Sequence, residues 1–79
     1  MWYVYFLKSE KKDWNYVGST SNLETRFEDH QSGNVQSTKH YRPFSLQAYI
    51  ALKDEKKARE LEKYFKTGSG RAFMNKRIL

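Results

Sequence analysis

The sequence contains no cysteine among its 79 residues. This absence excludes a disulfide-stapled scaffold, a zinc site built on thiolates and a thiol nucleophile. The longest apolar stretch, residues 2–7, is far shorter than the roughly 20 residues that a membrane-spanning helix needs. No basic region precedes it, so it does not have the form of a signal peptide. From these absences we expect a cytoplasmic protein that is not held in a membrane.

Acidic residues are scarce beside basic ones: nine Asp and Glu against 15 Lys and Arg give a formal net charge of +6. A positive surface attracts polyanions, and two Trp, six Tyr and five Phe accompany the charge. Nucleic acid is therefore the first partner to expect, ahead of an acidic membrane or an acidic protein. A chain of this length holds one hydrophobic core, so we expect a single domain over residues 1–79.

Aromatic and β-branched residues predict three strands. Residues 2–8 and 14–18 have the composition of strands, and the polar residues between them indicate a hairpin. Residues 44–51 alternate between apolar and polar side chains, which predicts a third strand of the same sheet. The residues expected on one face of that strand are Leu46, Ala48 and Ile50.

A first helix is predicted over about 22–32. Ser21 and Glu24 have the spacing of a capping box, in which the two side chains bond to each other's backbone amides. Leu23 and Phe27 form its apolar face, and Gly33 is a suitable end. The polar segment 33–43, which holds the only proline, is predicted to be a loop.

A second helix is predicted over about 54–67, because apolar residues recur there at intervals of three and four, and Gly68 is its expected end. Residues 69–79 suggest a short last helix that docks through Phe73 and Leu79. The fold class is therefore α+β: a three-stranded antiparallel sheet flanked by helices, in the order β-β-α-β-α-α.

Three charged or titratable residues lie beside the apolar helix faces. Arg26 and His30 border Phe27 on the first helix, and Glu62 lies three residues before Phe65 on the second. A carboxylate aimed along the core-facing edge needs a partner. Its simplest partner is Lys66, one helical turn later. Ion pairs of this kind are common on helix surfaces and imply no catalytic role.

The spacing of these residues resembles the GIY-YIG nuclease superfamily, which is named after two tripeptides. Residues 3–5 read Tyr-Val-Tyr and residues 16–18 read Tyr-Val-Gly, with ten residues between Tyr5 and Tyr16. The first tripeptide departs from the family pattern at its leading glycine, and both have valine for isoleucine. Arg26 follows eight residues after Gly18, with His30 and Glu62 downstream.

The resemblance covers about residues 2–74 and is closest to short stand-alone bacterial members. Like them, this sequence has Arg42 and Pro43 followed by an aromatic residue. It implies a GIY-YIG endonuclease-like fold and a divalent-metal-dependent phosphodiesterase.

The resemblance also implies a role for each matching residue. Glu62 would ligate Mg²⁺ or Mn²⁺, and the Arg26 guanidinium would hold two phosphate oxygens. Tyr5 or Tyr16 would orient or deprotonate the attacking water, with Tyr5 preferred and Tyr16 hydrogen-bonded beside it. His30 would accept a proton or contact a phosphate.

Further residues are candidates for binding the substrate. Gly18 would allow close approach of the backbone, and Lys39, Arg42 and Lys66 would contact phosphates. The remaining members of the expected basic footprint are Lys11, Lys12, Lys63 and Arg71. Asn75 is a candidate to lie near the metal, whereas His40 is expected to be an ordinary loop residue.

Three functions compete on this evidence. The first is a metal-dependent DNA endonuclease with a role in DNA repair or recombination. The second is a non-catalytic module of the same fold that binds nucleic acid or a partner protein. In the third, the residues are structural: Tyr5 and Tyr16 pack across the hairpin, Arg26 is a surface residue, and His30 and Glu62 stabilise the fold.

Overall fold

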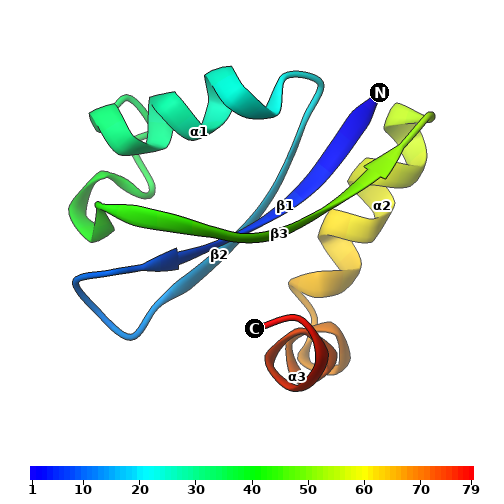
Figure 1. Ribbon diagram of the computed structural model, residues 1–79. Coiled ribbons are helices and arrows are strands. Elements are labelled where there is room, and N and C mark those ends of the chain that lie inside the picture. The colour runs from blue at the N-terminus through cyan, green and yellow to red at the C-terminus, as the bar shows by residue number, and fades with distance from the viewer.

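A computed structural model describes residues 1–79 and has the element order β-β-α-β-α-α (Figure 1). Its centre is an antiparallel sheet of three strands, β1 (Trp2–Ser9), β2 (Asn15–Thr20) and β3 (Phe44–Leu52). The strand order is β2-β1-β3, so β1 is central and the other two are edge strands. The α+β class and the three-stranded antiparallel sheet predicted from the sequence are confirmed.

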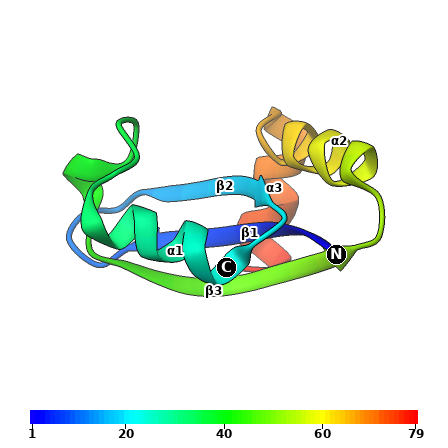
Figure 2. The ribbon, with the colours of Figure 1, turned by 90° about the horizontal axis from the view of Figure 1, so that it is seen from above.

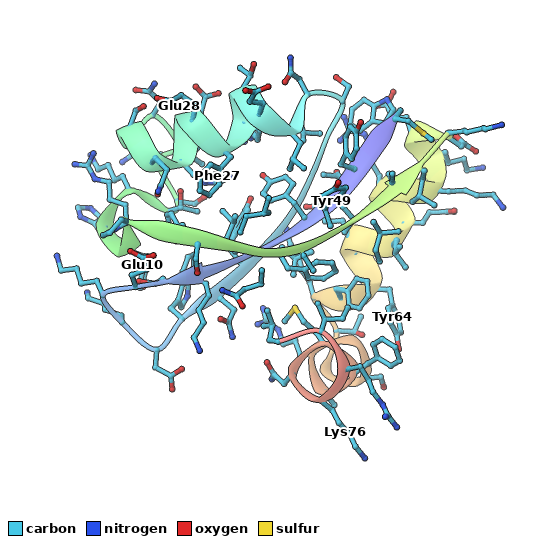
Figure 3. All side chains as sticks on the ribbon, viewed as in Figure 1. Glu10, Phe27, Glu28, Tyr49, Tyr64 and Lys76 are labelled. Atoms are coloured by element: carbon cyan, nitrogen blue, oxygen red, sulfur yellow. The ribbon has the colours of Figure 1, made fainter.

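Helices cover both faces of this sheet (Figure 2). α1 (Leu23–Ser32) lies against one face, and α2 (Glu55–Phe65) and α3 (Gly68–Arg77) lie against the other. Phe27 points from α1 toward the sheet, whereas its neighbour Glu28 points away (Figure 3). No helix in the structure has the length and apolar character needed to cross a membrane.

The central strand is buried on both faces, which explains its unbroken apolar sequence. Val4 and Phe6 belong to the core beneath α2 and α3, whereas Tyr5 and Leu7 belong to the core beneath α1. Successive side chains of a strand point to opposite faces, so the two clusters share one strand. Tyr5 therefore faces α1 from the middle of the sheet.

The face predicted for β3 is wrong at one residue. Phe6 pairs with Ala48, but Leu7 pairs with Leu46, so Gln47 is an extra residue in β3 and forms a bulge. The bulge places Leu46 on the α1 face and leaves Ala48 and Ile50 on the other face. The strand prediction assumed unbroken alternation, which one inserted residue reverses.

The capping box predicted for α1 does not form. Asn22, not Ser21, is the N-cap, and its side-chain oxygen accepts a hydrogen bond from the Thr25 backbone amide at 3.1 Å. Asparagine and serine cap equally well, so sequence spacing alone could not decide between adjacent residues. Gly33 ends the helix in the left-handed conformation, with φ of 82°, as predicted.

The second helix ends earlier than predicted. α2 stops at Phe65, and Gly68 begins α3 instead of ending α2. Thr67 caps α3 by accepting from the Gly70 amide at 3.2 Å. The last helix predicted over 69–79 is confirmed.

α3 does not dock through the aromatic residue that was predicted. Phe73 is 49% exposed, and Met74 is the residue of α3 that enters the core. Leu79 is partly buried against the same core, as predicted.

The segment predicted as a loop contains the short 3-10 helix η1 (Lys39–Tyr41). Two of its neighbours, Val35 and Thr38, are buried and anchor the segment to the end of α1. The segment therefore packs against the protein instead of extending from it.

Candidate active site

The hydroxyl of Tyr5 is the point at which three other predicted site residues, Gly18, Arg26 and His30, meet. Tyr5 is 1% exposed, and its hydroxyl lies 2.9 Å from Nε2 of His30. Gly18 is its direct partner in β2, and a Cβ at that position would overlap the Tyr5 hydroxyl. Gly18 is therefore required here for close packing, because any side chain would displace the phenol.

Arg26 reaches the same hydroxyl from α1, one helical turn before His30. Its interaction with Tyr5 is the main factor that raises the pKa of the guanidinium. The side chain is half-buried, so the guanidinium interacts with the buried phenol without being fully enclosed. A guanidinium fixed in this way is suited to binding phosphate oxygens in pairs.

Burial raises the pKa of Tyr5 to about 12. Arg26 opposes this rise, whereas Tyr16 and Glu62 add to it through charge repulsion. Tyr5 is therefore a protonated phenol at neutral pH, which disfavours it as the base that activates water. Nor is it hydrogen-bonded to Tyr16 as predicted: its hydroxyl pairs with His30 instead.

His30 is a neutral, fully enclosed side chain. It is 0% exposed, and burial, aided by the charge of Arg26, lowers its pKa to about 4. Its second nitrogen, Nδ1, lies 2.8 Å from the Thr38 hydroxyl. Because both ring nitrogens are occupied inside the protein, the imidazole has no free position for a phosphate.

Glu62 reaches β2 from the opposite face of the sheet. The Ser19 hydroxyl donates to its Oε1 atom, and Lys66 Nζ donates to Oε2 at 2.8 Å. The ion pair with Lys66 foreseen from the sequence thus exists, yet Glu62 remains 22% exposed. Its carboxylate also acts on Tyr5 across the edge of the sheet.

The two faces meet at the unpaired edge of β2. Tyr16 and Ser19 have opposite parity in the strand, so Tyr16 faces α1 while Ser19 faces α2. Lys66 bridges them, because its Nζ lies 5.4 Å from the centre of the Tyr16 ring. The site therefore wraps around an edge strand instead of filling a central pocket.

A cavity of about 410 Å³ opens beside this edge. Two cations, Lys66 and Arg71, line it together with Asn15 and Asn75, and Asp13 is the one acidic residue in its wall. Tyr16 forms part of the wall. Cations and amides around an accessible cavity suit a phosphate-bearing ligand.

The structure does not bring every candidate to this edge. Arg42 lies over Gly33, because a Cβ on that glycine would meet its guanidinium, and Lys39 lies in η1. Both are therefore at the C-terminal end of α1 and not in the wall of the cavity. His40 is exposed in the same segment, as expected for a loop residue.

Sequence reasoning missed two hydroxyl residues that contact the site. Ser19 follows the second tripeptide directly, and strand alternation could have placed it opposite Tyr16. Thr38 lies in a polar segment with no periodic pattern, so no sequence signal pointed to its contact with His30.

A row of aromatic rings beside the site was also missed. Trp14 stacks on Tyr41 with ring centres 3.9 Å apart, and it also stacks on Tyr16 at 6.0 Å. Tyr41 comes from η1, so this contact joins the hairpin to a segment far away in sequence. The row packs against Tyr16, whose ring also lies 5.4 Å from Lys66 Nζ.

The donors available for a divalent metal are few and all are oxygen. No group of three or more His, Cys, Asp or Glu side chains gathers as a protein cage would require. Glu62 is a partly exposed carboxylate with a hydroxyl oxygen, that of Ser19, beside it. This set fits Mg²⁺, which keeps several waters and takes one or two carboxylates and substrate phosphates as ligands.

The chain matches the family model described as GIY-YIG catalytic domain over residues 1–77. No curated protein and no solved structure gives a significant match. The family match covers every element of the fold and both tripeptides, and confirms the resemblance inferred from the sequence. The family is one of nuclease domains that act on nucleic acid, and the chain belongs to the GIY-YIG catalytic domains.

Proposed function

We propose that this protein is a divalent-metal-dependent endonuclease that hydrolyses phosphodiester bonds in DNA. The observation that supports this most directly is the arrangement at the edge of β2. There a carboxylate, a guanidinium and a phenol from three separate elements, Glu62, Arg26 and Tyr16, all act on the buried Tyr5 hydroxyl. Of the three, Tyr16 also lines the neighbouring cavity, whose wall carries Lys66 and Arg71.

In this proposal Glu62 holds the metal. Ser19 keeps the carboxylate oriented through Oε1, and Lys66 leaves Oε2 to bind a substrate phosphate. A bound divalent ion supplies charge stabilisation at the phosphate and the leaving oxygen. Until a metal binds, the ion pair with Lys66 balances the negative charge of the partly buried Glu62 carboxylate.

Arg26 binds the scissile phosphate and neutralises charge that develops on its oxygens in the transition state. The Tyr5 hydroxyl is buried and does not reach the substrate, so its role is to position the Arg26 guanidinium. Tyr16 is the more accessible phenol and orients the attacking water, and Lys66 Nζ lies 5.4 Å from the centre of its ring.

The proposed substrate is DNA that is bound without selection of its sequence, in repair or recombination. The domain is small, with principal extents of 29 × 26 × 18 Å, and offers little surface for reading base sequence. Lys66 and Arg71 contact phosphates at the cavity, and Lys39 and Arg42 extend the path toward the end of α1. Phosphate contacts position a nucleic acid without selecting its sequence.

The test is a cleavage assay on labelled linear, nicked, branched and single-stranded DNA and on RNA, with Mg²⁺, Mn²⁺ or EDTA. Wild type is compared with Glu62→Gln, and with Glu60→Gln as a matched control on the exposed part of the same helix. We expect metal-dependent cutting by wild type and Glu60→Gln. Glu62→Gln should lose at least about 10²-fold in rate while binding DNA normally in EDTA.

One observation favours the alternative of a binding module: the Lys66 ion pair already satisfies the Glu62 carboxylate without a metal. A module of this kind would retain DNA equally in wild type and Glu62→Gln and would cut none of the substrates with either ion. That result would reject the nuclease proposal.

A further inference from the structure

A chain of three buried side chains runs behind the site. Thr38 Oγ1 lies 2.8 Å from Nδ1 of His30, and Nε2 of His30 lies 2.9 Å from the Tyr5 hydroxyl. Thr38 and His30 are 0% exposed and Tyr5 is 1% exposed. Three fully enclosed polar groups in contact must share their protons among themselves or with the backbone.

Thr38 uses its hydroxyl in an unusual way for its position. It is the residue before η1, where a threonine commonly caps the helix, yet it makes no side-chain capping bond. Its hydroxyl instead lies between His30 and the Val35 carbonyl, to which it donates at 3.4 Å. The hydroxyl thus joins this segment to His30 on α1 instead of capping η1.

The donor and acceptor of each hydrogen bond in this series can be assigned by placing its protons. The enclosed phenol of Tyr5 must donate its proton, and Nε2 of His30 is the only acceptor that the structure places within hydrogen-bonding distance of it. A neutral imidazole that accepts at Nε2 carries its proton on Nδ1. That proton is then donated to Thr38 Oγ1, whose own proton goes to the Val35 carbonyl.

We propose that Thr38 is a positioning residue of the site: by accepting from Nδ1 it holds His30 in the Nδ1–H tautomer, and this keeps the Tyr5 hydroxyl turned toward His30. The oxygen lone pairs of Tyr5 are then presented to Arg26. This inference rests on the proposed function only for its effect on cleavage, because the tautomer is a property of the free protein.

The consequence concerns the guanidinium. In the reverse orientation, Nε2–H would donate to Tyr5, and the phenolic proton would have no acceptor among the groups around it. The proton would compete with Arg26 for the same space, since Arg26 interacts with that hydroxyl. The direction of the Tyr5 proton thus sets the position of Arg26, the cation proposed to bind the phosphate.

The experiment reads the tautomer first and cleavage second. Nitrogen-15 chemical shifts of the His30 ring are measured at neutral pH in wild type, Thr38→Ser and Thr38→Val. Serine keeps the acceptor, and valine removes it while keeping the shape. We expect a neutral ring protonated at Nδ1 in wild type and in Thr38→Ser, and a shift toward the Nε2–H form in Thr38→Val.

Cleavage of the DNA found to be the best substrate is then measured for the same proteins. We expect Thr38→Val to lower kcat by about 10–100-fold with little change in KM, as supporting hydrogen bonds typically do, and Thr38→Ser to retain most of the activity. A purely structural role would lower the melting temperature without this split between kcat and KM.

The outcomes separate the two proposals. An Nε2–H tautomer in wild type would overturn the positioning role of Thr38 whether or not the protein cuts DNA. An Nδ1–H tautomer in a protein that cuts no substrate would leave the tautomer assignment supported and reject the nuclease. An active Thr38→Val protein with unchanged kcat would also overturn the positioning role. If Thr38→Val does not fold, the tautomer of His30 in wild type still tests the positioning role of Thr38.

Discussion

Gly18 shows at the scale of one residue how closely the site is packed. A Cβ there would overlap the Tyr5 hydroxyl and touch the Tyr16 ring, whereas nothing lies within 4 Å of the corresponding position at Gly68. The two glycines therefore form a matched pair. One is required by its neighbours, and the other is not.

We predict that Gly18→Ala destabilises the protein by about 1–3 kcal/mol, the usual cost of an overpacked position. Gly68→Ala should be neutral or stabilising by a few tenths of a kcal/mol, since alanine favours helix. Urea unfolding of the two variants measures both changes. Equal stability of Gly18→Ala and wild type would show that the Tyr5 hydroxyl does not occupy the position described.

The buried His30 predicts how stability depends on pH. Its pKa is about 4 when folded, against an ordinary value of 6.5. Between these values the unfolded chain binds a proton that the folded protein does not, so stability is fully present above pH 6.5 and falls as pH decreases. From pH 7 to pH 5 the loss due to this residue should be about 2 kcal/mol.

Urea unfolding at these two pH values checks the effect. His30→Gln should lower stability at pH 7 and remove most of the dependence between pH 7 and pH 5. His40→Gln, which changes an exposed histidine, should leave that dependence intact. An unaltered pH dependence in His30→Gln would show that the loss arises from other groups.

At the scale of the element, the start of α1 offers a choice between two adjacent polar residues. Asn22 accepts from the Thr25 amide, whereas Ser21 is exposed and makes no bond to the helix. An N-cap satisfies one of the backbone donors that a helix start leaves unpaired. This helix carries Arg26 and His30, so its first turn also sets their position.

We predict that Asn22→Ala costs about 1 kcal/mol of unfolding free energy, and that Ser21→Ala changes it by less than about 0.5 kcal/mol. Thermal or urea unfolding of both variants is sufficient. If Ser21→Ala instead costs more than Asn22→Ala, Ser21 is the N-cap as the capping box requires, and the helix begins one residue earlier.

At the scale of the whole molecule, the net charge of +6 should govern how the proposed DNA substrate is first bound. Each phosphate neutralised by a Lys or Arg releases counterions, so affinity falls steeply as salt rises. With about four or five such contacts, affinity in EDTA should fall by about 10²–10³-fold between 50 and 200 mM salt.

A single variant tests whether the cavity lies on the DNA path. Arg71→Ala should reduce the slope of log affinity against log salt by about 1, because it removes one phosphate contact. Lys76→Ala is the control, since Lys76 projects away from α3 at the outside of the molecule (Figure 3). Equal slopes for both variants would place the DNA elsewhere on the surface.

The sequence by itself determined the order of the elements and the identity of the family. Strands and helices follow from local composition and from the spacing of apolar residues. These two signals are contained in short segments of the sequence. Tyr5, Tyr16 and Arg26 could be named as candidate site residues, because their spacing along the sequence resembles that of the family's two tripeptides and arginine. Exact boundaries were less accurate, because helix ends depend on single capping bonds.

Only the tertiary structure decided which atoms meet. Ser19 and Glu62 are 43 residues apart, and the bond between them depends on how α2 crosses the edge of the sheet. One extra residue in β3 turned Leu46 to the other face, an effect that no alternating pattern reveals. Thr38 contacts His30 because a polar segment folds back on α1. Such contacts arise from packing between distant segments, whose geometry local propensity does not contain.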